Sequence, residues 1–355
     1  MRCCTIARFC ADSHGGNSVI RGLVIGGVAA ALAFIASASA TTLDEVKKKG
    51  FVQCGVSQGL KGFSSPDDKG VWTGMDVDLC RGIAAAIFND PAKVKFTPLS
   101  AKERFTALQS GEIDVMSRTT TWSLSRDTTM GFDFRAVTYY DGQGLMVRKS
   151  LGIKSAKQLD GASVCILMGY SSTLTLADYF RANNMKYESI TFEKDDELVA
   201  AYDAGRCDTY TSDISGLFAN RLTLKNPDEH MVLPEIISKE PLGAVVRHGD
   251  NQWGDIVSWT LYAMVNAEEL GVDSKNVTAM LDSANPEISR LLGKEGSYGE
   301  GLGLSNEWAY QIIARVGNYA EIFERNVGKE SPLGIPRGLN ALWTRGGIMY
   351  APPIR

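Results

Sequence analysis

Cysteine and histidine are the residue types in this chain with the widest range of possible chemistry, from metal binding to redox exchange. The sequence holds seven cysteines and three histidines in 355 residues. Four of the cysteines follow residue 40, and they are Cys54, Cys80, Cys165 and Cys207. None has CxxC spacing, and only His230 and His248 lie in the same part of the chain, which argues against zinc. The four cysteines form either two disulfides or four buried free thiols, and we expect no metal and no cofactor.

Two segments have some features of known catalytic or phosphate-binding loops. Glu295–Gly303 is rich in glycine but lacks the GxxxxGK[ST] pattern, so we interpret it as a surface loop. Gly169–Thr173 reads Gly-Tyr-Ser-Ser-Thr and lacks the second glycine of a GxSxG elbow. The sequence therefore predicts neither a phosphate loop nor a serine hydrolase.

The first 40 residues have the order of a secretory signal peptide. Arg21 precedes an uncharged apolar run, Leu23–Ile35, which closes on the small residues Ala38-Ser39-Ala40. The alternative is a membrane anchor, but the run is shorter than the ~20 residues that a spanning helix needs. We expect cleavage before Thr41, a periplasmic location and, because export permits oxidation, disulfides rather than free thiols.

The chain as a whole has the composition of an ordinary folded protein. Apolar residues make up 44% and charged residues 22%, and the formal net charge is −4. A mildly acidic chain without a basic patch argues against nucleic acid as a partner. No later segment reaches spanning length without charge, and the length suggests two lobes or domains. We expect a soluble monomer.

Short strands alternate with helices along the chain, and this alternation is typical of parallel βαβ units in an α/β fold. The pattern predicts a first set at 51–56, 76–88, 94–97, 102–110 and 113–117. A second set follows at 144–148, 163–168, 174–183, 187–192, 195–204 and 207–211, and apolar alternation returns at 243–247. The C-terminal part is mostly helical, with helices expected at 256–267 and 308–323. Two similar sets and a return segment predict two lobes joined by two crossings.

Six segments in this order resemble solute-binding protein family 3, the amino-acid receptors of ABC transporters. They are Thr73–Asp78, Phe105–Asp114, Ser117–Arg126, Tyr140–Gly144, Ala204–Asp208 with Ser212-Asp213, and Lys239–Gly243. Gly338–Trp343 and Tyr350–Arg355 are similar to the general L-amino-acid-binding branch. The resemblance implies the type II periplasmic-binding fold, in which each lobe is a mostly parallel sheet flanked by helices. It implies lobe 1 at 41–142 and 244–355, including a C-terminal helical extension, and lobe 2 at 143–243.

The resemblance also implies which residues hold the ligand. A free amino acid carries a carboxylate and an ammonium, and both need partners once water is removed. Arg126 ends the segment similar to the family's ligand-gripping loop, and its planar guanidinium suits the carboxylate. Asp213 suits the ammonium, while the hydroxyls of Thr119 and Thr121 and the helix N-terminus at Ser171 complete the expected set. Since Arg126 and Asp213 fall in different lobes, a ligand held by both favours closure of the hinge.

The side-chain end of the site is less defined. Leu60 and Phe63 lie in the loop where the family often packs an aromatic ring over the ligand. Leu60 in that place would form an apolar wall, and the alternative is that both residues only pack under the loop. An apolar wall suits broad specificity. Tyr170 departs from the family's Gly-Thr-Thr pattern and could reshape this space. Pairing of Cys54 with Cys80 and of Cys165 with Cys207 would stiffen each lobe and leave the hinge free.

An enzyme on the same scaffold, similar to cyclohexadienyl dehydratase, is the main alternative function. Such an enzyme needs a positioned acid or base besides an arginine. The cleft segments offer no histidine and no second well-placed carboxylate, so we expect a binding protein and not an enzyme. The expected partners are free L-amino acids and the membrane permease of an ABC transporter.

Overall fold

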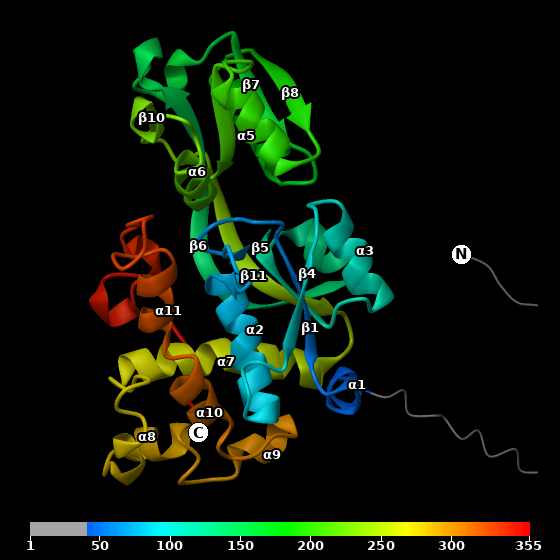
Figure 1. The fold of residues 1–355 in the computed structure, drawn as a ribbon, viewed down its shortest axis with the longest axis vertical. Helices are drawn as coiled ribbons and strands as arrows, with labels where there is room; N and C mark the ends of the chain where they lie inside the picture. Colours follow the sequence, from blue (N-terminus) through cyan, green and yellow to red (C-terminus); the bar gives the residue numbers. More distant parts are fainter. Residues whose placement is uncertain (1–40) are drawn as a thin grey trace, which may run out of the picture. The chain divides into compact units, whose positions relative to one another are not determined.

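The computed structural model describes residues 41–355, so the expected signal peptide and its cleavage before Thr41 lie outside the described residues. The compact unit Ala40–Arg355 contains two lobes, each with its own strands and helices (Figure 1). None of the helices described between residues 41 and 355 combines the length and the apolar character needed to cross a membrane.

One sheet of nine strands runs through both lobes. In lobe 1, β4 (Val94–Pro98), β1 (Val52–Val56) and β5 (Val115–Thr121) pair in parallel. In lobe 2, β9 (Thr209–Asp213), β7 (Ala162–Leu167) and β8 (Tyr187–Phe192) also pair in parallel. These are the two α/β sets expected from the alternation of strands and helices. The parallel sets place the ends of β5 and β9, and the residues after them, at the boundary between the lobes.

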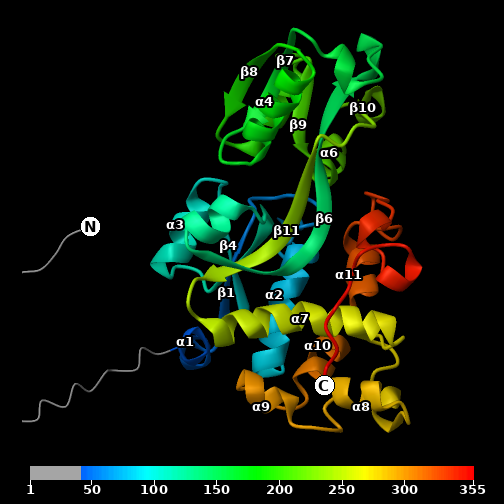
Figure 2. The ribbon, with the colours of Figure 1, turned by 180° about the vertical axis from the view of Figure 1, so that it is seen from behind.

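Two long strands connect the lobes, and they are the two expected crossings. β6 (Phe132–Arg148) and β11 (Ser238–Arg247) pair antiparallel from Ser238 opposite Gln143 to Arg247 opposite Phe132, side by side in Figure 2. The register shifts around Gly243, where an added Cβ would lie 2.7 Å from the Ala136 carbonyl oxygen. Only glycine fits that approach, so the close contact at the bulge requires Gly243.

The helices of lobe 1 cover its sheet and build the larger core. α2 (Met75–Phe88), α7 (Asn251–Glu269), α10 (Trp308–Arg315) and α11 (Tyr319–Asn326) pack on one another, and α1 (Thr42–Lys49) contacts α7. α3 (Glu103–Ser110) packs on β1, β5 and β11 in a separate hydrophobic cluster. The C-terminal part adds α8 (Pro286–Leu291) and α9 (Tyr298–Leu302). Lobe 2 has α4 (Ser172–Ala182), α5 (Asp195–Asp203) and α6 (Ile214–Arg221), and β10 (His230–Val232) joins β6.

The single helix expected at 308–323 is two helices in the structure. α10 ends at Arg315, Gly317 has φ +106°, and Asn318 then caps α11 by accepting a hydrogen bond from the Glu321 amide. A residue with that φ cannot continue a right-handed helix. The apolar spacing carries on across the break, so periodicity alone did not reveal it.

Both expected disulfides are present, and each lies within one lobe. Cys54–Cys80 ties β1 to α2, and Cys165–Cys207 ties β7 to the turn before β9. All four cysteines are buried at 1% exposure or less, so each bridge is part of a core rather than a surface link. The bridges leave the β6 and β11 crossings unconstrained.

Removal of either bridge is expected to destabilise the protein by about 2–4 kcal/mol, because each closes a long loop in the unfolded chain. The measurement is urea unfolding of Cys54→Ala/Cys80→Ala, of Cys165→Ala/Cys207→Ala and of the fourfold variant. The two losses are expected to add, since the bridges share no contacts. A fourfold variant as stable as either double variant would contradict two independent bridges.

Candidate functional site

A cavity of about 760 Å³ is lined by residues of both lobes. Lobe 1 contributes the segment Ser57–Leu60, Ala101 and Arg118, and lobe 2 contributes Tyr170, Asp213 and residues of α5 and α6. Of the seven residues expected to contact a ligand, Leu60 and Asp213 line this cavity directly. The other five, including Arg126, lie outside its lining, and their positions are described below.

Three arginines of lobe 1, Arg104, Arg118 and Arg126, are buried near the boundary between the lobes. Arg126 follows β5 in the one-turn segment Ser125–Thr129, and its Nη1 donates to the Thr121 carbonyl oxygen at 2.8 Å. No other described residue accepts a hydrogen bond from its guanidinium, although the side chain is only 8% exposed. Burial lowers the pKa of Arg126, and the charges of Glu240 and Asp213 counteract this shift. Arg126 is therefore a buried cation with N–H donors that no described residue uses.

Arg104 and Arg118 reach from lobe 1 to lobe 2. Arg118 donates from Nε to the Leu99 carbonyl oxygen at 2.8 Å and from Nη1 to the Tyr170 hydroxyl at 3.3 Å. Arg104, on α3, donates to the Thr120 hydroxyl at 3.1 Å and to the Gly169 carbonyl oxygen at 3.2 Å. Both guanidinium carbons lie within 6 Å of the Tyr170 ring centroid. Tyr170, the departure from the family pattern, is thus the lobe 2 residue on which two arginines converge.

Asp213 is the buried anion of lobe 2. It ends β9, precedes α6 and is 5% exposed, and no described donor forms a hydrogen bond to its carboxylate. Burial raises the pKa of Asp213 well above the ordinary value, and the charges of Asp141 and Glu240 raise it further, against the opposing effect of Arg104 and Arg126. An unpartnered carboxylate in this position needs either a proton or a cation.

Glu240 on β11 holds two of the expected ligand hydroxyls. Its Oε2 accepts from Thr121 Oγ1 at 2.6 Å and from Ser171 Oγ at 2.9 Å. Ser171 precedes α4, so its position at a helix N-terminus is as expected. Thr121 belongs to lobe 1 and Ser171 to lobe 2, so the carboxylate on the crossing strand joins both lobes. A ligand carboxylate that binds the hydroxyls of Thr121 and Ser171 must share them with Glu240 or displace the Glu240 carboxylate.

Asp141 lies opposite Glu240 in the paired crossings. Its carboxylate accepts from the Gly142 amide at 2.8 Å and from the Ser215 hydroxyl of α6. Burial raises the pKa of Asp141 to about 6, and the hydrogen bonds from Ser215 and Gly142 limit the shift. The two crossings therefore bring two carboxylates together at the hinge.

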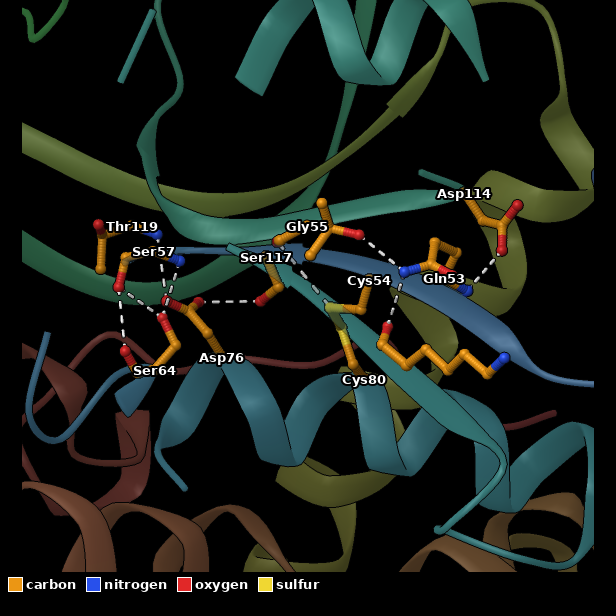
Figure 3. Close-up of a disulfide and its surroundings, with 12 residues drawn as sticks. Gln53, Cys54, Gly55, Ser57, Ser64, Asp76, Cys80, Asp114, Ser117 and Thr119 are labelled. Carbon is orange, nitrogen blue, oxygen red and sulfur yellow. Dashed lines mark hydrogen bonds between the residues drawn. A yellow bond between two sulfur atoms is a disulfide. The ribbon is translucent and has the colours of Figure 1, made fainter. Parts of the chain in front are cut away.

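Thr119 is strained and partly unsatisfied. Its backbone has φ +39°, which is unusual for a β-branched residue, and its amide donates to Asp76 Oδ2 at 3.2 Å. Figure 3 shows Asp76 between Thr119 and Ser117, whose hydroxyl donates to it at 2.9 Å. The Thr119 hydroxyl is buried without a hydrogen-bond partner among the described residues. The Thr119 backbone is thus fixed within β5 by Asp76, while the Thr119 hydroxyl stays available for a further hydrogen bond.

The two residues expected to wall the side-chain space have different positions. Leu60 lines the cavity, held by a hydrogen bond from its amide to Ser57 Oγ at 3.2 Å. Phe63 is 1% exposed and packs edge-on against Tyr139, with ring centroids 5.4 Å apart. Of the two interpretations, packing under the loop therefore holds for Phe63, because its ring lies in the lobe 1 core.

Sequence reasoning missed Arg104, Arg118, Asp141 and Glu240. The last three lie inside segments used for the resemblance, where Asp141 and Glu240 served only as markers of the crossings. Their burial beside one another depends on the pairing of β6 with β11, which no local pattern reveals. Arg104 has the sequence context of an ordinary helix residue, and nothing in the chain marks it.

The known proteins similar to this chain include two amino-acid-binding proteins. The chain is 63% identical to the general L-amino acid-binding periplasmic protein AapJ of Rhizobium johnstonii, over 92% of this chain and 97% of that one. It is 54% identical to the glutamate/glutamine/aspartate/asparagine-binding protein BztA of Rhodobacter capsulatus, over 93% of this chain and 98% of that one.

A solved periplasmic binding protein from Brucella ovis, with glutathione bound, is 58% identical and superimposes with a TM-score of 0.88, over 89% of this chain and all of that one. The family model of the bacterial extracellular solute-binding proteins, family 3, matches residues 52–273. The chain belongs to the bacterial extracellular solute-binding proteins, family 3.

Proposed function

We propose that this protein is the periplasmic substrate-binding component of an ABC amino-acid uptake transporter. It binds L-amino acids with broad specificity between its lobes and delivers them, as a monomer, to a membrane permease. Export with cleavage before Thr41 gives it access to the periplasm. The names of the two curated relatives support a receptor for amino acids, and one of them is called a general L-amino-acid-binding protein.

The observation that carries this proposal is the pair Arg126 and Asp213. Both are nine-tenths buried, they have opposite charges, and each influences the pKa of the other. Each has hydrogen-bonding capacity that no described residue uses. A zwitterion offers a carboxylate for the guanidinium and an ammonium for the carboxylate, so one small ligand satisfies both. Thr119, with its unused hydroxyl, completes the carboxylate side.

Hinge closure follows from where these residues lie. We propose lobe boundaries at 142/143 and 243/244, within the paired crossings. Contacts between the lobes are few and polar: Arg118 to Tyr170, Arg104 to Gly169, an ion pair of Lys102 with Glu193 at 2.6 Å, and the hydroxyls on Glu240. The Lys102–Glu193 pair is exposed and contributes little. A ligand held by both Arg126 and Asp213 adds the contacts that favour the closed state.

Broad specificity follows from the walls beyond the zwitterion. Leu60 is apolar and demands no hydrogen bond from a ligand side chain, and the cavity is much larger than one amino acid. The glutathione of the Brucella ovis protein is consistent with recognition of the head group, because its glutamate keeps amino and carboxyl groups on one carbon. We propose binding without catalysis, and turnover of prephenate or arogenate by the purified protein would contradict it.

Calorimetry with the twenty L-amino acids tests the proposal, and small-angle scattering at saturation tests closure. We expect micromolar or tighter binding of several chemically different L-amino acids, with a smaller radius of gyration in the bound state. If none of the twenty bound, the proposed function would fail. Binding without compaction would refute the hinge-closing mechanism.

Affinity for amino acids is expected to fall as the pH is lowered from 8 toward 5. The ligand ammonium needs ionised Asp213, whose pKa is raised by burial, so a proton competes with the ligand. The decrease is at most about tenfold per pH unit for one proton, and binding releases that proton. Calorimetry in two buffers with different ionisation enthalpies measures the release. An affinity that stays constant over this range would contradict a raised pKa of Asp213 in the ligand-free protein.

A further inference from the structure

The cavity extends well past the residues that hold the zwitterion. Asp213 precedes α6, and the lining continues through Gly216 to Asn220 near the other end of that helix, then to Thr223 and Lys225. Seven residues of α-helix separate Asp213 from Asn220, a rise of about 10 Å. Val199, Ala200 and Asp203 of α5 line the same cavity. A free amino acid anchored at Asp213 leaves this outer end empty.

The outer end has its own polar groups. Asn220 is 7% exposed, and its Nδ2 donates to Asp195 Oδ2 at 3.1 Å and to the Tyr210 hydroxyl at 2.8 Å. Both of its N–H groups are therefore used, which leaves the carbonyl oxygen to accept a hydrogen bond from a ligand N–H. Lys225 is exposed and has no ion-pair partner within residues 41–355, so it can meet a carboxylate.

Some of the acidic residues that line the cavity already have hydrogen-bond or ion-pair partners. Asp195 is held by Asn220 and Tyr210, and Glu193 pairs with Lys102. Asp196 accepts from the Glu197 amide, and Asp203 remains as a second acceptor for N–H groups. An acceptor-rich wall with a lysine at its end suits an amide-linked tail that terminates in a carboxylate.

We propose that the outer cavity is a second subsite, which binds the tail of a peptide linked through the side chain of its first residue. This inference rests on the proposed function, because the head of the ligand is the zwitterion held by Arg126 and Asp213. An ordinary dipeptide uses its first α-carboxylate in the peptide bond and leaves Arg126 without a partner. A γ-glutamyl peptide keeps both head groups on one carbon and directs its peptide N–H and terminal carboxylate along α6.

Three probes separate the head from the tail. L-Glutamine carries the head alone, γ-L-glutamylglycine is glutamine with a carboxymethyl group on its amide nitrogen, and α-L-glutamylglycine is the isomer with the same atoms and charges. Calorimetry is expected to show the γ isomer bound at least as tightly as glutamine and about 100-fold or more tighter than the α isomer. Equal affinity for the two isomers would overturn the inference.

Two variants locate the tail. Ala200→Phe fills the outer cavity from an exposed helix position and is expected to weaken γ-glutamylglycine about tenfold or more, with glutamine unchanged. Lys225→Gln is expected to weaken it up to about fivefold, as for an exposed ion pair. Ala182→Phe and Lys149→Gln, at exposed positions of lobe 2 outside the cavity lining, are the matched controls.

The possible failures are distinguishable. If other L-amino acids bind but neither glutamine nor γ-glutamylglycine does, the second subsite is wrong and the proposed function stands. If Ala200→Phe weakens L-lysine and leaves γ-glutamylglycine unchanged, the outer end selects cations and the inference is overturned. If no L-amino acid binds, the proposed function fails and the inference falls with it.

Discussion

Arg126→Met is expected to weaken binding of L-amino acids by roughly 100-fold to several thousand-fold. The substitution leaves the ligand carboxylate buried without its partner, which costs about 3–5 kcal/mol. Arg126→Lys restores the charge but not the planar pair of donors, so it is expected to recover only part of the loss. Calorimetry with the amino acid that the native protein binds most tightly measures both effects.

Arg315→Met is the control for this series. Arg315 is exposed on α10, and its Nε donates to Gln311 far along the chain from the cleft residues. The affinity of Arg315→Met for the amino acid is expected to match that of the native protein. The circular dichroism spectra of all three variants are also expected to match the native spectrum. Retention of native affinity by Arg126→Met would show that another group, such as Arg118, holds the carboxylate.

Asp213→Asn is expected to weaken binding by a similar factor while leaving the ligand-free protein as stable or more stable at pH 8. The amide cannot balance the ligand ammonium, which again costs about 3–5 kcal/mol. The folded-state pKa of Asp213 is raised by burial and by Asp141 and Glu240, so its ionisation destabilises the folded state as the pH rises. Asparagine removes that ionisation. The difference in melting temperature between Asp213→Asn and the native protein should therefore shrink toward pH 4.

Asp208→Asn provides the contrasting control. Its carboxylate accepts from the Ser163 amide and hydroxyl, and those hydrogen bonds hold the pKa of Asp208 below its usual value. This variant is expected to lose stability at neutral pH and to keep native affinity. If Asp213→Asn also lost stability and kept its affinity, Asp213 would be a structural residue only.

Local patterns predicted most elements because each lobe repeats simple βαβ units. The apolar spacing at Asp76–Phe88 became α2, and the paired apolar runs became the parallel sets around β1 and β7. The pattern did not show that β6 and β11 join both sets into one sheet, since this pairing brings together residues about 100 positions apart. It also missed the break before Asn318, where one glycine conformation overrides a continuous apolar stripe.

Arg126 and Asp213 could be proposed as ligand contacts from the sequence because each lies in a characteristic segment, and the structure buries both. The site was not predictable where tertiary packing gives a residue its role. Glu240 engages the hydroxyls of Thr121 and Ser171, which had been expected to face a ligand. Phe63 and Leu60 are three residues apart in one loop, yet one ring lies in the core and the other side chain lines the cavity.

A crystal structure grown with a tightly bound L-amino acid tests the binding mechanism most directly. We predict its carboxylate within about 3 Å of the Arg126 guanidinium and its ammonium within about 3 Å of the Asp213 carboxylate, with the lobes closed around it. An amino acid bound elsewhere, or bound in the cleft with either Arg126 or Asp213 making no contact to it, would contradict the mechanism.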